Sequence, residues 1–233
     1  MCGRFTLKTP ASDVARLLGL LTPVALEARY NIAPTQRVAI VRDVPGEGRQ
    51  LAMLAWGLVP SWADDPAVAT RLFNARAETV ATKPAFRESF RKRRCLIPAD
   101  GFYEWQRQGK AKVPYHIRLQ DGGPFALAGL WDRWRHGELE IESCTVITTE
   151  ANELVRPLHN RMPVILPTDA YDSWLDASLE NRELLQHWLK PYPADAMTAS
   201  AVSSRVNAAG FEGADCLEPP HQAPDSQKML DFN

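Results

Sequence analysis

Residues 37–56 read RVAIVRDVPGEGRQLAMLAW, and this stretch decides the class of fold that the chain can adopt. Two short apolar segments, residues 37–42 and 50–56, have the composition and the length of strands. They are joined through Pro45-Gly46-Glu47-Gly48, a sequence typical of a turn. The stretch therefore predicts two strands that follow one another along the chain.

Further segments with the composition of strands follow toward the C-terminus. They are residues 95–98, 113–119, 125–130, 141–148, 163–166 and 200–205. Because these strands come in runs without regular helices between them, the sequence favours an α+β fold. We expect mostly antiparallel sheets, packed into a barrel-like core with helices at its periphery.

Helices are expected at four places. The first begins near Pro10, and its apolar side chains recur at helical spacing up to Leu21. The others are residues 68–81, a helix entered at Thr168, and residues 184–189. Residues 30–35 contain an asparagine and a proline, which indicates a loop.

The length of 233 residues, 45% of them hydrophobic, is enough for a domain with its own core. We expect a single domain over residues 1–218, followed by a loose tail over residues 219–233. The N-terminus does not resemble a signal peptide, and no apolar run is long enough to span a bilayer. The expected location is therefore cytoplasmic, on the nucleoid when DNA is bound, and without membrane contact.

The net charge of the chain and the spacing of its histidines and cysteines exclude several classes of function. A formal net charge of −1 argues against non-specific coating of nucleic acid, so any DNA-binding surface must be local. The five histidines show no H-E-x-x-H pattern. No C-x-x-C spacing joins the four cysteines, which are Cys2, Cys95, Cys144 and Cys216. We therefore expect no metal site and no cofactor.

Cys2 is the most informative residue because of its position. Once Met1 is removed, it presents an α-amine and a thiol on adjacent carbons, and such an amine has a pKa of about 8. The amine can form a Schiff base with an aldehyde, and the thiol can then close a five-membered thiazolidine ring. An abasic deoxyribose offers this aldehyde in its ring-opened form. Position alone favours a plainer interpretation, an early residue of a partly ordered terminus.

Three further motifs carry polar groups suited to chemistry. Residues 73–79 place Asn74 close to an arginine, residues 101–105 set Glu104 among aromatic side chains, and residues 157–163 hold His159 between prolines. Desolvation would raise the pKa of such a carboxyl toward that of a useful proton donor. Taken singly, each has a plainer interpretation: a turn asparagine, a glutamate paired with an arginine, and a loop histidine.

Together and in this order, these motifs resemble those of the SOS response-associated peptidase family, also called abasic-site processing proteins. The resemblance rests on residues 1–5, 30–35, 56–62, 74–79, 94–98, 101–105, 148–152 and 159–163. It extends to about Leu166, with weaker likeness through about Arg205. Several motifs in a fixed order are far more specific than any one of them alone.

For this chain the resemblance implies an enzyme that senses abasic sites in single-stranded DNA through a covalent thiazolidine at Cys2. According to the resemblance, Asn74 positions the amine and the sugar by hydrogen bonds, and Glu104 acts as general acid and base. His159 helps to open the closed sugar. The resemblance also implies autocatalytic release of Met1, although an aminopeptidase could remove it equally well. Whether the protein reverses the crosslink or cleaves DNA as a lyase stays open.

The same resemblance implies a local DNA-binding groove. Trp62 and Pro34 would stack on or separate bases next to the lesion, and the other interpretation of Trp62 is a core tryptophan. For residues 91–94, DNA proximity competes with a solvated charge run. Phosphate contacts are assigned to Arg4, Arg71, Arg76 and Arg161.

Two other functions fit parts of the sequence. An N-terminal-nucleophile amidohydrolase also begins Met-Cys-Gly, but it would need an oxyanion hole and would leave the Glu104 and His159 motifs without a role. A non-catalytic single-stranded DNA-binding module would tolerate Cys2→Ser without loss. The expected partner is single-stranded DNA with abasic sites. We expect a monomer, with replication-fork proteins as further candidate partners.

Overall fold

A closed barrel of five strands forms the centre of the protein. The computed structural model describes residues 2–22, 25–109 and 111–220. Around the barrel the strands pair in the order β10, β4, β3, β6 and β9, and β9 pairs again with β10. All these pairings are antiparallel except that of β10 with β4. Their bounds are β3 (Arg37–Val44), β4 (Gly48–Trp56), β6 (Arg94–Ala99), β9 (Phe125–His136) and β10 (Leu139–Glu150). Closure gives each strand two neighbours, so this core exposes no long strand edge.

Three short strands extend the barrel. They are β5 (Asn74–Arg76), β11 (Arg161–Pro163) and β12 (Ile165–Leu166). Near its C-terminal end β10 pairs with both β5 and β11, so that Thr148 lies between Arg76 and Pro163. The motif that contains Arg76 and the motif that contains Pro163 are more than 80 residues apart in sequence, and both thus meet on β10.

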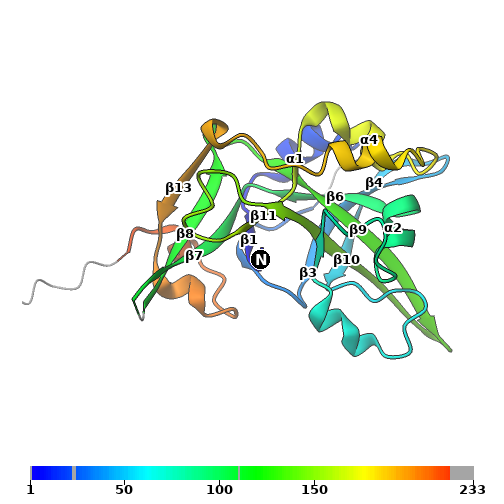
Figure 1. The fold of residues 1–233 in the computed structure, drawn as a ribbon, viewed down its shortest axis with the longest axis horizontal. Coiled ribbons are helices and arrows are strands. Elements are labelled where there is room, and N and C mark those ends of the chain that lie inside the picture. Colours follow the sequence, from blue (N-terminus) through cyan, green and yellow to red (C-terminus); the bar gives the residue numbers. More distant parts are fainter. Residues whose placement is uncertain (1, 23–24, 110, 221–233) are drawn as a thin grey trace, which may run out of the picture.

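A second, five-stranded sheet lies beside the barrel (Figure 1). Its order is β13 (Met197–Ala201), β8 (Ala111–Leu119), β7 (Gly101–Gln108), β1 (Phe5–Leu7) and β2 (Arg29–Ile32). All of its pairings are antiparallel. Because β1 begins three residues after Cys2, this sheet positions the segment that carries Cys2.

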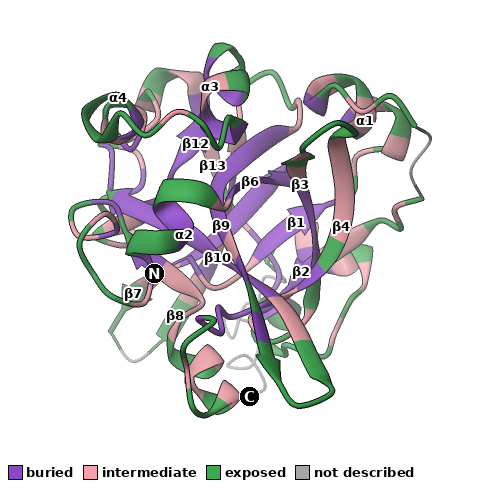
Figure 2. Cartoon of the chain, turned by 90° about the vertical axis from the view of Figure 1, so that its right-hand side faces the viewer, coloured by how far each residue is buried: buried purple, intermediate pink, exposed green. Residues whose placement is uncertain are grey.

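Short helices cover the outside of the two sheets. They are α1 (Ala11–Leu18), α2 (Arg87–Lys92), α3 (Tyr171–Leu175) and α4 (Arg182–His187). The 3-10 turns are η1 (Pro66–Arg71), η2 (Thr168–Ala170), η3 (Ala194–Ala196), η4 (Ser204–Asn207) and η5 (Ala214–Leu217). Figure 2 shows β6 and most of β9 buried, β4 mostly intermediate, and α2 and α4 largely exposed. This arrangement confirms the expected α+β fold with antiparallel sheets, a barrel-like core and peripheral helices.

The predicted β3–β4 hairpin and the predicted first helix are both present, but with different lengths from those expected. The hairpin of β3 and β4 turns through residues 45–47, with Gly46 at φ 80° in the turn and Gly48 at φ 76° where β4 begins. Helix α1 ends earlier than predicted, because Gly19 adopts the left-handed conformation at φ 65°. Leu21 consequently lies beyond the helix and is exposed rather than part of its apolar face.

Three local predictions were wrong. Residues 30–35 are not only a loop, because Arg29–Ile32 forms β2 and pairs with β1. The expected helix over residues 68–81 is η1 followed by strand β5, which β10 holds by parallel pairing. The last strand ends at Ala201, and η4 follows it instead of continued strand. Of the predicted tail, residues 221–233 lie outside the described residues.

Arg94 does not belong to a solvated or DNA-facing charge run. Its guanidinium is buried at 3% exposure and donates to backbone carbonyls, among them those of Trp174 at 2.7 Å and Phe90 at 2.8 Å. Arg94 therefore ties α2 and α3 to the barrel. Along the described segments, no helix combines the length and the apolar character needed to cross a membrane.

Candidate active site

The N-terminal segment is held against β7, the strand that carries Glu104. The Tyr103 N–H donates to the Arg4 carbonyl at 3.0 Å, and the Asp100 N–H donates to the Thr6 carbonyl at 2.9 Å. Cys2 lies at the start of this segment with no exposed surface. The predicted nucleophile is thus a fixed, buried residue, and the interpretation of a partly ordered terminus does not apply to it.

A buried polar cluster anchors β1 on the other side of this pairing. The Thr6 hydroxyl donates to Asp100 at 2.6 Å and lies 3.1 Å from Nε2 of His116. Burial lowers the pKa of His116 to about 4, so the ring is neutral at physiological pH. A Cβ atom at Gly101 would lie 2.0 Å from His116 Nε2, which explains why glycine begins β7.

Glu104 is a buried carboxyl at 3% exposure, four residues into β7. Burial raises its pKa to about 7, because transfer from water penalises the charged form. Burial also raises the pKa of the Cys2 thiol well above its usual range, and the nearby charge of Glu104 adds to this shift. The two groups are therefore close, and the thiol holds its proton at neutral pH.

His159 lies next to Glu104, on a loop that is stabilised by hydrogen bonds among its own residues. The Asn152 side chain accepts the Val155 N–H at 2.9 Å, and the His159 N–H donates to the Val155 carbonyl at 3.0 Å. Nδ1 of His159 accepts the Arg161 N–H at 3.0 Å and lies 4.0 Å from Oε1 of Glu104. Nδ1 also lies 3.3 Å from the Arg161 carbonyl. Burial lowers the pKa of His159, which favours the neutral ring at physiological pH.

Asn74 lies on β5, opposite Val146 of β10. Its Nδ2 donates to the Phe73 carbonyl at 2.9 Å, and the Trp56 indole donates to the same carbonyl at 2.8 Å. Its Oδ1 is buried and accepts no hydrogen bond from the residues that the structure describes. A buried acceptor in this state has the capacity for one donor.

A cleft of about 690 Å³ opens beside Glu104 and His159. Its other lining residues are Trp105, Arg107, Lys112, Pro157, Leu158 and Asn207. Arg107 and Lys112 are exposed and face each other across the β7–β8 pair. Sequence analysis missed both cations. The cleft thus combines proton-transfer groups, an indole and a pair of cations.

Comparison with known proteins assigns the chain to a family. Residues 1–209 match the family described as "SOS response associated peptidase (SRAP)". The chain belongs to this family. The resemblance predicted from the sequence motifs is therefore confirmed.

Individual relatives of the SRAP family agree over nearly the full chain. The abasic site processing protein YoaM of Bacillus subtilis is 42% identical over 224 residues, 94% of this chain and 98% of YoaM. The abasic site processing protein YoqW of the same species is also 42% identical, over 89% of this chain and 94% of YoqW. The crystal structure of a Bacteroides thetaiotaomicron protein superposes with a TM-score of 0.79 at 30% identity. It covers 87% of this chain and 93% of that one.

The residues assigned to DNA contact by the SRAP resemblance fall into two groups. Arg71, Arg76 and Trp62 are exposed, with Trp62 at 62%, so the interpretation of Trp62 as a core residue was wrong. Pro34 is half-buried.

The other two arginines of this SRAP set already make contacts within the protein. Arg4 donates to Asn31 Oδ1 at 2.8 Å and to the Val206 carbonyl at 2.6 Å. Arg161 forms an ion pair with Glu78 at 2.5 Å and donates to the Thr148 carbonyl at 2.6 Å. These contacts fix both guanidinium groups next to the segments that carry Cys2 and His159.

Proposed function

We propose that the protein captures abasic sites in single-stranded DNA by a covalent bond to Cys2, after removal of Met1. One observation carries this proposal: a fully buried Cys2 beside a carboxyl whose pKa is about 7 and a histidine ring 4.0 Å from that carboxyl. Membership of the SRAP family and relatives named abasic site processing proteins support it.

The first step needs a sugar in its aldehyde form. We assign its opening to His159, whose neutral ring can donate a hydrogen bond to the ring oxygen of the sugar and polarise it. As the bond between C1′ and this oxygen breaks, the oxygen takes up a proton and the C1′ hydroxyl loses one to solvent, which leaves the aldehyde. The α-amine of Cys2 then adds to C1′ of the sugar to give a carbinolamine. Loss of water from this adduct gives a Schiff base.

Glu104 is suited to the proton transfers of this condensation. A carboxyl with a pKa of about 7 is divided between its acid and base forms at neutral pH. In its acid form it protonates the departing hydroxyl of the carbinolamine. In its base form it accepts a proton from the amine. We assign Asn74 to hold the amine, since its buried Oδ1 has the capacity for one more donor.

In the second step the Cys2 thiol closes the ring. Sulfur forms a bond to C1′, the C=N double bond becomes a single bond, and the thiol proton moves to the nitrogen. The product is a thiazolidine, and the overall reaction releases one water. Because burial keeps the thiol protonated, the amine reacts first and the thiol second. Consumption of the aldehyde prevents β-elimination, which shields the DNA strand from breakage.

Release of Met1 is a hydrolysis that must precede this chemistry. The same Cys2, Glu104 and His159 could catalyse it, which is the autopeptidase activity that the family name suggests. A thiol with a raised pKa is a weak nucleophile at neutral pH, so an aminopeptidase is the competing route. A lyase reaction would proceed from the Schiff base if β-elimination were faster than closure of the thiazolidine ring.

The DNA strand is proposed to lie across Arg107 and Lys112 of the cleft, with the exposed Arg71 and Arg76 as further phosphate contacts. These positions suit a reader of backbone and lesion rather than of base sequence. We propose a single domain over residues 1–218 that acts as a monomer on DNA. A role in the DNA damage response would follow, with replication-fork proteins as candidate partners.

Mass spectrometry of the purified protein with an abasic oligonucleotide, without reducing agent, tests the proposal. We expect a stable adduct at the mass of the protein without Met1 plus DNA minus one water. Cys2→Ala and Cys2→Ser should lose it, whereas Cys144→Ser, at a buried cysteine of β10, should keep it. Absence of an adduct from protein confirmed to lack Met1 would refute the covalent mechanism. Binding without an adduct would instead favour the DNA-binding module.

A further inference from the structure

A segment near the C-terminal end of the described chain packs against the start of the chain. Residues 204–212, which we name the C-terminal clasp, comprise η4 and the residues that follow it. Val206 and Phe211 of the clasp belong to one apolar cluster with Tyr103 and Trp105. These two aromatic residues are the neighbours of Glu104 on β7. The underside of the clasp therefore lies against the strand that carries the candidate acid/base group.

Glu212 fastens the clasp to β2. Its Oε1 accepts the backbone N–H groups of Tyr30 at 2.5 Å and Asn31 at 2.8 Å. Its Oε2 forms an ion pair with Arg29 at 3.2 Å. Hydrogen bonds to a charged acceptor are stronger than those between neutral groups. One exposed carboxylate thus holds three consecutive residues of β2.

Asn31 joins the clasp to the N-terminal segment. Its buried side chain donates from Nδ2 to the carbonyls of Ala208 at 2.9 Å and Phe211 at 2.7 Å. Its Oδ1 accepts Arg4 Nη1 at 2.8 Å, and the same Nη1 donates to the Val206 carbonyl at 2.6 Å. A buried amide with its donors and its acceptor engaged has a fixed orientation. It therefore fixes Arg4 relative to β2 and to the clasp.

The clasp acts on both sides of the pair formed by Cys2 and Glu104. On one side it holds the guanidinium of Arg4, whose backbone carbonyl is bonded to β7 and which follows Cys2 by two residues. On the other side Asn207 Oδ1 accepts the Trp105 indole N–H at 2.7 Å, at the wall of the cleft. Both partners of the proposed proton transfer are therefore next to residues that the clasp holds.

We propose that Glu212 is a positioning residue for the crosslinking reaction, which holds Cys2 in register with Glu104 through the C-terminal clasp. Glu212 contacts β2, so it acts through Asn31 and Arg4 rather than on the sugar. Proton transfer requires hydrogen-bond reach, and a misplacement of about 1 Å can cost about a hundredfold in rate. Residues 1–209 match the SRAP family, and Glu212 lies beyond them. Its role is therefore not part of the family match.

This inference rests on the proposed function, since it concerns the rate of the covalent step. It also has a consequence for the fold that does not need that step. The Tyr103 N–H bonds to the Arg4 carbonyl, so it should exchange with solvent faster when Glu212 no longer holds the clasp. Absence of an adduct from the native chain would refute the mechanism at Cys2. Faster exchange of the Tyr103 amide would still support the clasp.

Single-turnover crosslinking to abasic single-stranded DNA tests the effect on the reaction. We expect Glu212→Ala to lower the maximal rate by about 10- to 100-fold, with less than a threefold change in the DNA concentration for half-maximal rate. Glu212→Gln keeps an oxygen for the two backbone N–H groups and should restore the rate to within about fivefold of the native chain. A native maximal rate in Glu212→Ala, or equal losses in the two variants, would overturn the positioning role.

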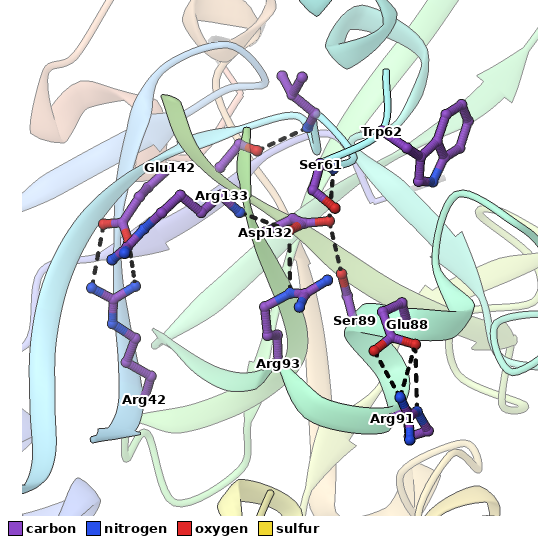
Figure 3. Close-up of polar contacts among 12 residues, drawn as sticks. Arg42, Ser61, Trp62, Glu88, Ser89, Arg91, Arg93, Asp132, Arg133 and Glu142 are labelled. Atoms are coloured by element: carbon purple, nitrogen blue, oxygen red, sulfur yellow. Dashed lines mark hydrogen bonds and ion pairs between the residues drawn. The ribbon is translucent and has the colours of Figure 1, made fainter. Parts of the chain in front are cut away.

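Hydrogen exchange followed by NMR tests the effect on the N-terminal segment. In Glu212→Ala the Tyr103 amide should exchange about tenfold faster. Glu142→Ala is the matched control, because Glu142 is also a carboxylate paired with arginines, Arg42 and Arg133, but in the barrel (Figure 3). It should leave both the crosslinking rate and the exchange of the Tyr103 amide at native values.

Unchanged exchange of the Tyr103 amide in Glu212→Ala would overturn the positioning role. Equal changes in Glu142→Ala would overturn it too, because they would show general destabilisation. Melting curves keep each measurement below the unfolding range.

Discussion

Glu104 and Asp132 are two carboxyls of nearly equal burial that the structure surrounds in different ways. Asp132 accepts backbone N–H groups from Ser61 and Arg133 and is paired with Arg93. Glu104 faces a buried thiol and lies 4.0 Å from a histidine ring, and its pKa is raised to about 7. Burial alone therefore does not decide what a carboxyl does. Hydrogen bonds and an ion pair make Asp132 a structural anchor, whereas burial gives Glu104 a pKa at which it exchanges its proton near neutral pH.

The largest expected difference between the two carboxyls is in the rate of crosslinking. We expect Glu104→Gln to lower the maximal rate with abasic single-stranded DNA by about 10²- to 10³-fold, because general acid/base catalysis is lost. Asp132→Asn should change it by less than threefold. The measurement is single-turnover crosslinking at saturating DNA. Similar rate losses in both variants would show that the two carboxyls do not differ in the way proposed.

A second prediction concerns the stability of the fold against pH. The folded pKa of Glu104, about 7, lies above its ordinary value of 4.5, so the folded state binds the proton more tightly. This contribution is fully present below pH 4.5 and is lost as the pH rises toward 7, by on the order of 3 kcal/mol. Denaturant unfolding at pH 5 and pH 8 should therefore show a smaller decline in Glu104→Gln than in the native chain. An equal decline in both would contradict the raised pKa.

His159 offers a test of the neighbourhood of Glu104. His159→Asn should lower the crosslinking rate by about 10- to 100-fold for a closed abasic sugar, because the ring-opening donor is lost. An aldehyde that needs no ring opening should react with this variant at nearly the native rate. Arg156→Gln, at an exposed position of the same loop, serves as the control. Equal losses with both aldehydes would assign His159 to a later step.

The barrel could be predicted from the sequence because its strands are long and apolar. The pairing of β3 with β4 follows from two such segments and one turn, and β6, β9 and β10 have the same character. Strand β5 could not be predicted in this way. Its three residues are held by β10, about 70 residues away in the chain, and local sequence carries no record of that pairing.

The candidate site likewise contains residues that the sequence predicts and contacts that it does not. Cys2, Glu104 and His159 are separated by tens of residues, and only the order of the motifs indicated that they act together. The arrangement of Nδ1 of His159 depends on a backbone donor at Arg161, and the setting of Trp62 depends on Asp132. Both contacts form only in the folded chain. They join residues of common types, so the sequence alone does not indicate them. Arg107 and Lys112 were missed because charges in a hairpin resemble ordinary surface charges.

Those two cations give the smallest expected effect. Arg107 and Lys112 face each other across β7 and β8, and like charges in this arrangement destabilise a strand pair slightly. A DNA phosphate in the cleft would relieve that repulsion. The double variant Arg107→Gln with Lys112→Gln should therefore weaken binding of single-stranded DNA about threefold to tenfold. It should lower the slope of log affinity against log salt by between one and two. Arg133→Gln with Arg135→Gln, which removes two charges paired with Glu140 and Glu142, is the matched control. If this control gave the same change in slope, the effect would reflect net charge, and the cleft would have no special part in binding the strand.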